Sequence, residues 1–149
     1  MLLGNIQLAW TNIGSYNDEC NLFLCDSLVS FRRFDSYSCK WNYSEIKQWL
    51  NNEFINSSFS DEQRAMLVRN DELDCFVFLL SDFEYLKYMD SIPSILASWW
   101  LRSRGQNSYD ALSVCHTGLI SDVSMHVGHC CGVRPAILLR KIKEADNER

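Results

Sequence analysis

The sequence predicts a single α+β domain in which short helices are separated from a mainly antiparallel β-sheet. Strand-like patterns lie towards the two ends of the chain, and patterns typical of helix starts lie between them. At 149 residues, with 47% hydrophobic and 22% charged residues, the chain can bury a core without disulfides or metal ions. We assign residues 1–143 to this domain and residues 144–149 to a solvated C-terminal tail.

The first third of the chain predicts a β-hairpin over residues 5–26. Apolar side chains occupy every second position of residues 6–10, which is the pattern of a half-buried strand. A turn-forming segment over residues 14–18 leads to a second apolar run over residues 21–25. Residues 30–40 are polar and aromatic, and we expect them to form a loop.

The middle of the chain predicts three short helices. Each begins with a capping box, in which an N-cap side chain and an acid or amide three residues later satisfy free amide groups. The boxes are Asn42-x-x-Glu45, Ser60-x-x-Gln63 and Ser81-x-x-Glu84. A continuous apolar run over residues 76–80 predicts a buried strand directly before the third helix.

The last third of the chain returns to β-prone residues. Strands are predicted over residues 99–102, 111–115, 119–127 and 133–141. Gly118 fits a tight turn between two of them. Residues 104–131, between two apolar segments, are polar, small and sulfur-bearing, without the periodicity of a helix. Because irregular segments on rigid frames commonly carry recognition, we expect a binding surface there.

Charge and cysteine content restrict the classes of partner. The net charge of −5 and the isoelectric point near 5.1 argue against nucleic acid, because a phosphate-binding surface needs a basic patch. No apolar run is long enough to insert into a membrane, and no secretory signal is visible. Seven cysteines without an export signal are expected to stay free thiols, with Cys20, Cys25 and Cys75 in the core.

Four segments resemble, in the same order, the motifs of a family of uncharacterised bacterial and phage domains. They are residues 41–51, 78–84, 99–105 (W-W-L-R-S-R-G) and 132–136 (G-V-R-P-A). That family is similar to the C-type-lectin-like superfamily, which also holds formylglycine-generating enzymes and the variable proteins of diversity-generating retroelements. The resemblance implies a C-type-lectin-like fold of twisted antiparallel sheets with two or three short helices. Because no secretory signal or membrane-spanning run is visible, the expected location is cytoplasmic or virion-associated.

In the variable proteins, the segment before the closing strand faces the ligand, and its counterpart here is residues 106–131. The resemblance therefore implies a non-catalytic recognition domain without a cofactor, binding a protein or glycan, and in its specific form a diversified variable protein. Adenine-directed mutagenesis of Asn codons yields Tyr, His, Asp, Ser and Cys, which this segment contains. The expected ligand-binding residues are Trp100, Asn107, Tyr109, Asp110, His116, Asp122, His126 and His129. Tyr109 is the expected anchor, because rigid aromatic side chains supply contact area at low entropic cost.

Metal and thiol chemistry are the alternatives for this segment. Its soft ligands are Cys115, His116, His126, His129, Cys130 and Cys131. Adjacent residues of a strand point to opposite faces, so the two vicinal pairs are poor zinc ligands. A thiol- or metal-dependent oxidase of the formylglycine-generating type would use Cys130 and Cys131 and is the second hypothesis. A Cys115 nucleophile paired with a histidine lacks a defined orienting group. Acidic residues are too sparse to favour calcium.

Two arginines lie in the strongest motifs. Arg102 and Arg134 are each flanked by apolar residues. Ligand contact is one interpretation of them. We favour the other, in which a buried guanidinium bonds loop carbonyls or a carboxylate.

Overall fold

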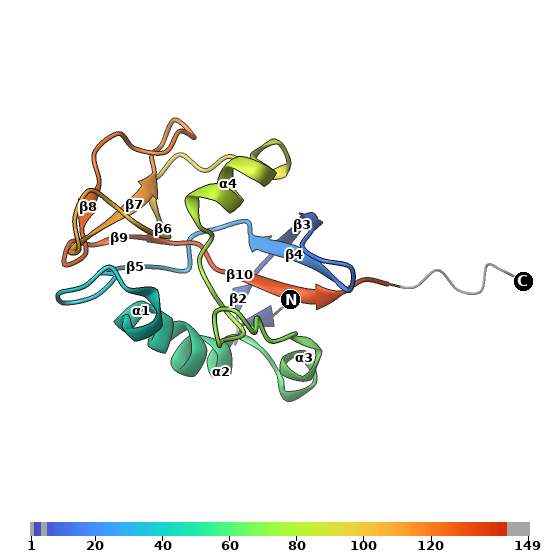
Figure 1. Ribbon diagram of the computed structural model, residues 1–149. Helices are drawn as coiled ribbons and strands as arrows, with labels where there is room; N and C mark the ends of the chain where they lie inside the picture. The colour runs from blue at the N-terminus through green and yellow to red at the C-terminus, as the bar shows by residue number, and fades with distance from the viewer. Residues whose placement is uncertain (1, 4–5, 143–149) are drawn as a thin grey trace, which may run out of the picture.

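The computed structural model describes residues 2–3 and 6–142, and the side chains of residues 8–142. The described chain is a mixed α+β domain with two larger sheets and short helices on either side of them (Figure 1). A two-stranded pair, β1 (Leu2–Leu3) and β2 (Ile6–Gln7), precedes these sheets. No helix in the described part of the chain is long and apolar enough to cross a membrane.

The first larger sheet has three antiparallel strands in the order β10-β4-β3. Its strands are β3 (Trp10–Ser15), β4 (Cys20–Cys25) and β10 (Ala136–Arg140). The predicted hairpin is therefore present as β3 and β4, but its first strand begins later than expected. The reason is that residues 6–7 pair with β1, so the chain joins the hairpin at Trp10.

The second sheet has five strands in the order β5-β9-β6-β7-β8. Its strands are β5 (Ser30–Arg32), β6 (Trp99–Arg104), β7 (Asp110–Val114), β8 (Met125–His126) and β9 (Cys131–Val133). The β6–β9 pair is parallel and the others are antiparallel. Two expectations are corrected here. The predicted loop over residues 30–40 contains β5, and the strand expected over residues 119–127 shortens to β8.

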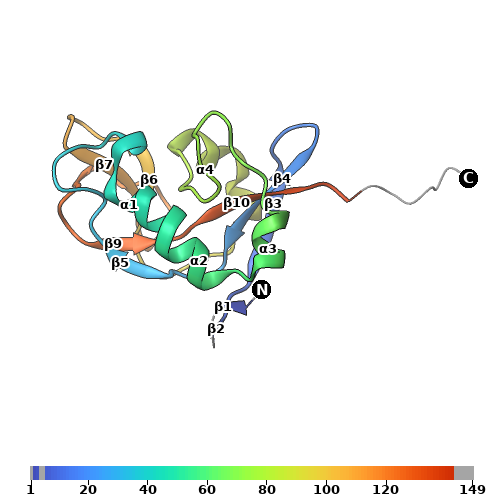
Figure 2. The ribbon, with the colours of Figure 1, turned by 90° about the horizontal axis from the view of Figure 1, so that it is seen from below.

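One long helical stretch and two short helices pack against the sheets (Figure 2). The stretch consists of α1 (Glu45–Trp49), the π-helical η2 (Leu50–Phe54) and α2 (Ile55–Ser58), and it is followed by α3 (Asp61–Met66) and α4 (Asp82–Tyr88). Short 3₁₀ turns are η1 (Trp41–Tyr43) and η3 (Met89–Ser91).

Two of the three predicted capping boxes are confirmed. At both Ser60 and Ser81 the hydroxyl accepts an amide hydrogen bond and the side chain three residues later bonds back to the cap. The first helix instead begins after Ser44, whose hydroxyl accepts from the Lys47 amide. Asn42 is not a cap because it lies inside the η1 turn, and this predicted box is wrong.

Asn51, within the π-helical η2, fixes the segment that follows α3. Its side-chain amide donates to the carbonyls of Lys47 (2.9 Å) and Val77 (2.8 Å). Its oxygen accepts from the amides of Phe76 (3.0 Å) and Val77 (2.9 Å). Of the buried strand predicted over residues 76–80, residues 77–80 are buried and Phe76 is exposed. The segment makes one isolated bridge, Phe78 to Ala136, instead of a full strand.

The predicted strand over residues 133–141 is divided between the two sheets. β9 ends at Val133, Arg134 and Pro135 form the crossing, and β10 begins at Ala136 in the other sheet. Proline has no amide hydrogen and therefore cannot continue a strand ladder as a donor. The Pro135 carbonyl still accepts from the Cys25 amide at 2.9 Å, so β4 remains joined to the crossing.

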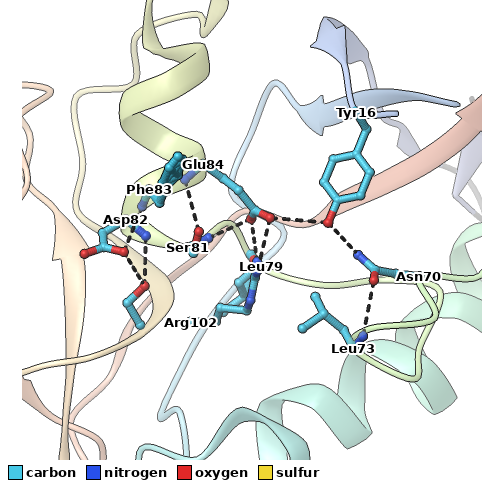
Figure 3. Close-up of polar contacts among 10 residues, drawn as sticks. Tyr16, Asn70, Leu73, Leu79, Ser81, Asp82, Phe83, Glu84 and Arg102 are labelled. Atoms are coloured by element: carbon cyan, nitrogen blue, oxygen red, sulfur yellow. Dashed lines mark hydrogen bonds and ion pairs between the residues drawn. The ribbon is translucent and has the colours of Figure 1, made fainter. Parts of the chain in front are cut away.

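The Arg102 guanidinium organises a partly buried polar network (Figure 3). It donates to the Leu79 carbonyl at 2.7 Å and forms a two-point ion pair with Glu84. Glu84 also accepts from the Ser81 amide and from the Tyr16 hydroxyl. These partners confirm the structural interpretation of Arg102.

Replacing Arg102 by Ala should lower the free energy of unfolding by about 3 kcal/mol, because it leaves the largely buried Glu84 carboxylate without its cationic partner. Urea denaturation of the full chain measures this change. The matched control is Arg33→Ala, which removes the exposed ion pair with Glu45 and should cost less than about 1 kcal/mol. Equal losses in the two variants would contradict a structural role of the Arg102–Glu84 pair.

A candidate binding surface and an adjacent cleft

Three exposed rings from residues 106–131 form a row, which we call the aromatic row. The ring centroids of Tyr109 and His126 are 5.6 Å apart, and those of His126 and His129 are 5.8 Å apart. Tyr109 is 49% exposed, and both histidines are exposed. The structure thus brings together three of the eight predicted residues.

The backbone below the aromatic row is firmly held. His126 pairs with Asp110 across β7 and β8, and the Val127 amide donates to the Tyr109 carbonyl at 2.9 Å. Val127 is fully buried, and its carbonyl accepts from the Phe34 amide at 2.9 Å. On the ring itself, His126 Nδ1 accepts from the Gly128 amide at 2.9 Å. The rings therefore stand on a frame connected to the core.

Asp110 and Asn107 support the loop beside this row. Asp110 is buried, and its carboxylate accepts from the Ser124 hydroxyl at 2.9 Å. Asn107 is half-buried, and its side-chain oxygen accepts from the Tyr109 amide at 3.1 Å. The expectation that Asp110 faces a ligand is corrected, because its carboxylate is turned inward to hold the loop.

Trp100 is also corrected, because it is a core residue. Its side chain is 0% exposed, and Nε1 donates to the Arg32 carbonyl at 2.9 Å. The ring contacts Phe34 edge-on at a centroid distance of 5.7 Å. Trp99, on the opposite side of β6, is buried as well.

His116 and Asp122 are exposed but lie in turns outside the aromatic row. Asp122 lies in the bend before β8. His116 lies in the turn after β7, where the Gly118 amide donates to the Cys115 carbonyl at 2.9 Å. Gly118 has a φ of +89°, which glycine adopts without strain, so the predicted tight turn is confirmed.

The cysteines differ in how far they are buried. The predicted core residues Cys20, Cys25 and Cys75 are buried. Cys130 is exposed while Cys131 is buried, and burial raises the pKa of the Cys131 thiol to about 11. The vicinal pair therefore does not present two accessible thiols together. No group of three or more His, Cys, Asp or Glu side chains within the described residues is placed to hold a metal ion.

Cys115 lies in an environment that lowers the pKa of its thiol, in contrast to Cys131. Its sulfur lies 2.8 Å from the Thr117 hydroxyl, and this hydrogen bond lowers the pKa of the Cys115 thiol. The thiolate is the reactive form of cysteine, so a lowered pKa increases its reactivity at neutral pH.

Limited alkylation with iodoacetamide near pH 7.5 should modify Cys115 first, with Cys130 next. Cys131 should stay unmodified until the protein unfolds, because its raised pKa and its burial both oppose attack. Mass spectrometry of proteolytic peptides measures the order, with urea-unfolded protein as the control. Native-state labelling of Cys131 at the rate of Cys115 would contradict these environments.

A cleft of about 580 Å³ opens between α4, the loop of residues 92–96 and the turn of residues 115–119. Its apolar lining includes Ile95, Leu96 and Leu119. Arg134 and His116 are its cationic or basic side chains, and no acidic residue lines it. The Tyr85 hydroxyl at the cleft donates to the Gly118 carbonyl and thereby ties α4 to the turn. Residues near the 92–96 loop were not predicted as site residues, because the sequence there shows no chemical motif.

The fold and site define a compact α+β domain with an exposed aromatic row and a neighbouring cleft. A model of a domain of unknown function, DUF6273, matches residues 19–141, and the chain belongs to this family. The matched region contains all four motifs, in agreement with their resemblance to an uncharacterised domain family. No match to a curated protein or to a solved structure was found.

Proposed function

We propose that this protein is a non-catalytic recognition domain with a C-type-lectin-like fold, which binds a protein ligand through residues 106–131. The single observation that carries the proposal is the aromatic row of Tyr109, His126 and His129. Tyrosine and other aromatic side chains dominate the energetics of many protein interfaces, especially when a rigid frame holds them. The mixed α+β architecture, with helices packed on antiparallel and mixed sheets, is compatible with the fold that the family resemblance implies.

Exposed apolar side chains in the same segment favour a protein over a glycan as the ligand. Leu119 is 64% exposed and Val123 is 71% exposed. Apolar contacts of this kind gain free energy by leaving water, whereas sugars bind chiefly through hydrogen bonds and ring stacking.

The test compares the wild-type domain with the double variant Tyr109→Ala/His126→Ala. Both side chains are exposed, so the melting temperature should change by less than about 3 °C. Peptides selected on the wild-type domain from a displayed random library should lose binding to the double variant. They should keep binding to Tyr43→Ala, which removes a tyrosine that is 76% exposed elsewhere. Fluorescence polarisation of the selected peptides measures both.

Two outcomes would overturn this proposal. Selected peptides that bind the double variant as well as wild type would show that the aromatic row is not the binding surface. Binding on a glycan array without any peptide binding would assign the surface to sugars.

The proposal has a more specific form, in which residues 106–131 are diversified by a retroelement. The exposed members of the predicted set are tyrosine, histidine and aspartate, which adenine-directed mutagenesis of Asn codons produces, whereas Ala111, Val114 and Val127 between them are buried. A near-identical template repeat beside the gene, differing at adenines, is the expected finding. Sequencing of the gene neighbourhood checks it, and a neighbourhood without such a repeat would contradict diversification.

A further inference from the structure

Arg134 is a buried cation whose charge lacks a carboxylate partner. The residue is 1% exposed, yet it lines the 580 Å³ cleft. Its Nε donates to the Cys25 carbonyl at 2.7 Å, and its Nη2 donates to the Pro93 carbonyl at 2.9 Å. Within residues 8–142 the guanidinium makes no ion pair, and Nη1 has no hydrogen-bond partner.

The remaining surroundings of Arg134 compensate its charge incompletely. The guanidinium lies over the Trp99 ring at 5.0 Å, which is a favourable cation–π contact. Asp26 favours the charge of Arg134 electrostatically but forms no ion pair with it, and its carboxylate accepts from the Thr11 hydroxyl instead. Burial lowers the pKa of the Arg134 guanidinium, in keeping with an environment that disfavours its charge. Arg102, a partly buried arginine, has its carboxylate from Glu84.

We propose that the cleft, which shares Leu119 with the 106–131 segment but lies apart from the aromatic row, is a second binding site, for a small organic carboxylate with an apolar body. The carboxylate pairs with the free edge of the Arg134 guanidinium, and the apolar body lies against Ile95, Leu96 and Leu119. Guanidinium groups bind carboxylates through paired hydrogen bonds, and the burial of Arg134 itself strengthens the attraction. The volume lies within the range of small-molecule pockets, about 300–1,000 Å³.

The cleft lining favours a carboxylate over a phosphate group. A single buried cation balances one negative charge, whereas phosphate carries more charge at neutral pH and is usually met by several donors. The walls are mainly apolar, which suits a ligand whose charge is confined to one end.

Hexanoate is the probe, and hexanamide is its neutral counterpart of the same shape. Titration of the isotopically labelled full chain by NMR should show hexanoate binding with a dissociation constant on the order of 1 mM. The Arg134 Nε–H signal and the amides of residues 117–119 should shift. Hexanamide should bind about tenfold more weakly, because it cannot supply the missing charge.

Arg134 itself is a poor first variant, since it also holds the Cys25 and Pro93 carbonyls. Thr117→Glu places a carboxylate at the mouth of the cleft and should weaken hexanoate binding by about tenfold or more. Gln48→Glu adds the same charge on the exposed face of α1 and should leave binding unchanged.

Three results would overturn the proposal. They are equal binding of hexanoate and hexanamide, tighter binding of inorganic phosphate than of hexanoate, and shifts confined to the separate groove beside Arg140 and Lys141. The peptide-binding test of the aromatic row is independent of all three, so either proposal can fail alone.

Discussion

The crossing of the chain from one sheet to the other at Arg134 and Pro135 is the constraint on which the rest of the structure depends. The Arg134 guanidinium binds the end of β4 through Cys25 and the 92–96 loop through Pro93. Gly132, just before the crossing, passes so close to the Ser98 carbonyl that a Cβ there would lie 2.6 Å from it. The two sheets, β6 and the cleft wall are therefore positioned by one short segment.

The buried Arg134 and the partly buried Arg102 have their charges compensated in different ways. Arg102 has a carboxylate partner, a carbonyl and a capping network around it, so its polar groups are satisfied within the fold (Figure 3). Arg134 donates to two carbonyls and lies over the Trp99 ring. Its Nη1 lacks a hydrogen-bond partner among the described residues, and the side chain lines the cleft. Burying a guanidinium is costly without a paired charge. This difference separates an arginine with a structural role from one that also marks a site.

Residues 106–131 combine rigid and exposed features over a short length. Most β7 side chains are buried, and the side chains of Asn107, Asp110 and Ser124 take part in hydrogen bonds that hold the loops between the strands. The backbone below the aromatic row would therefore lose little conformational freedom in the binding proposed for it, which is the advantage of a preorganised surface. The DUF6273 match over residues 19–141 includes both this surface and the strands and helices that hold it.

The sequence by itself determined those features whose partners lie within a few residues. The capping boxes at Ser60 and Ser81 and the turn at Gly118 are local, and the flanking apolar residues were enough to place Arg102 and Arg134 in the interior. The tertiary structure alone decided that Asp110 turns inward and that Trp100 bonds to a carbonyl 68 residues away. It also divided the apolar run of residues 133–141 between two sheets. It also decided that Tyr109, His126 and His129 align while His116 joins the cleft. These outcomes depend on strand pairing and on distant backbone carbonyls, which no local pattern of residues encodes.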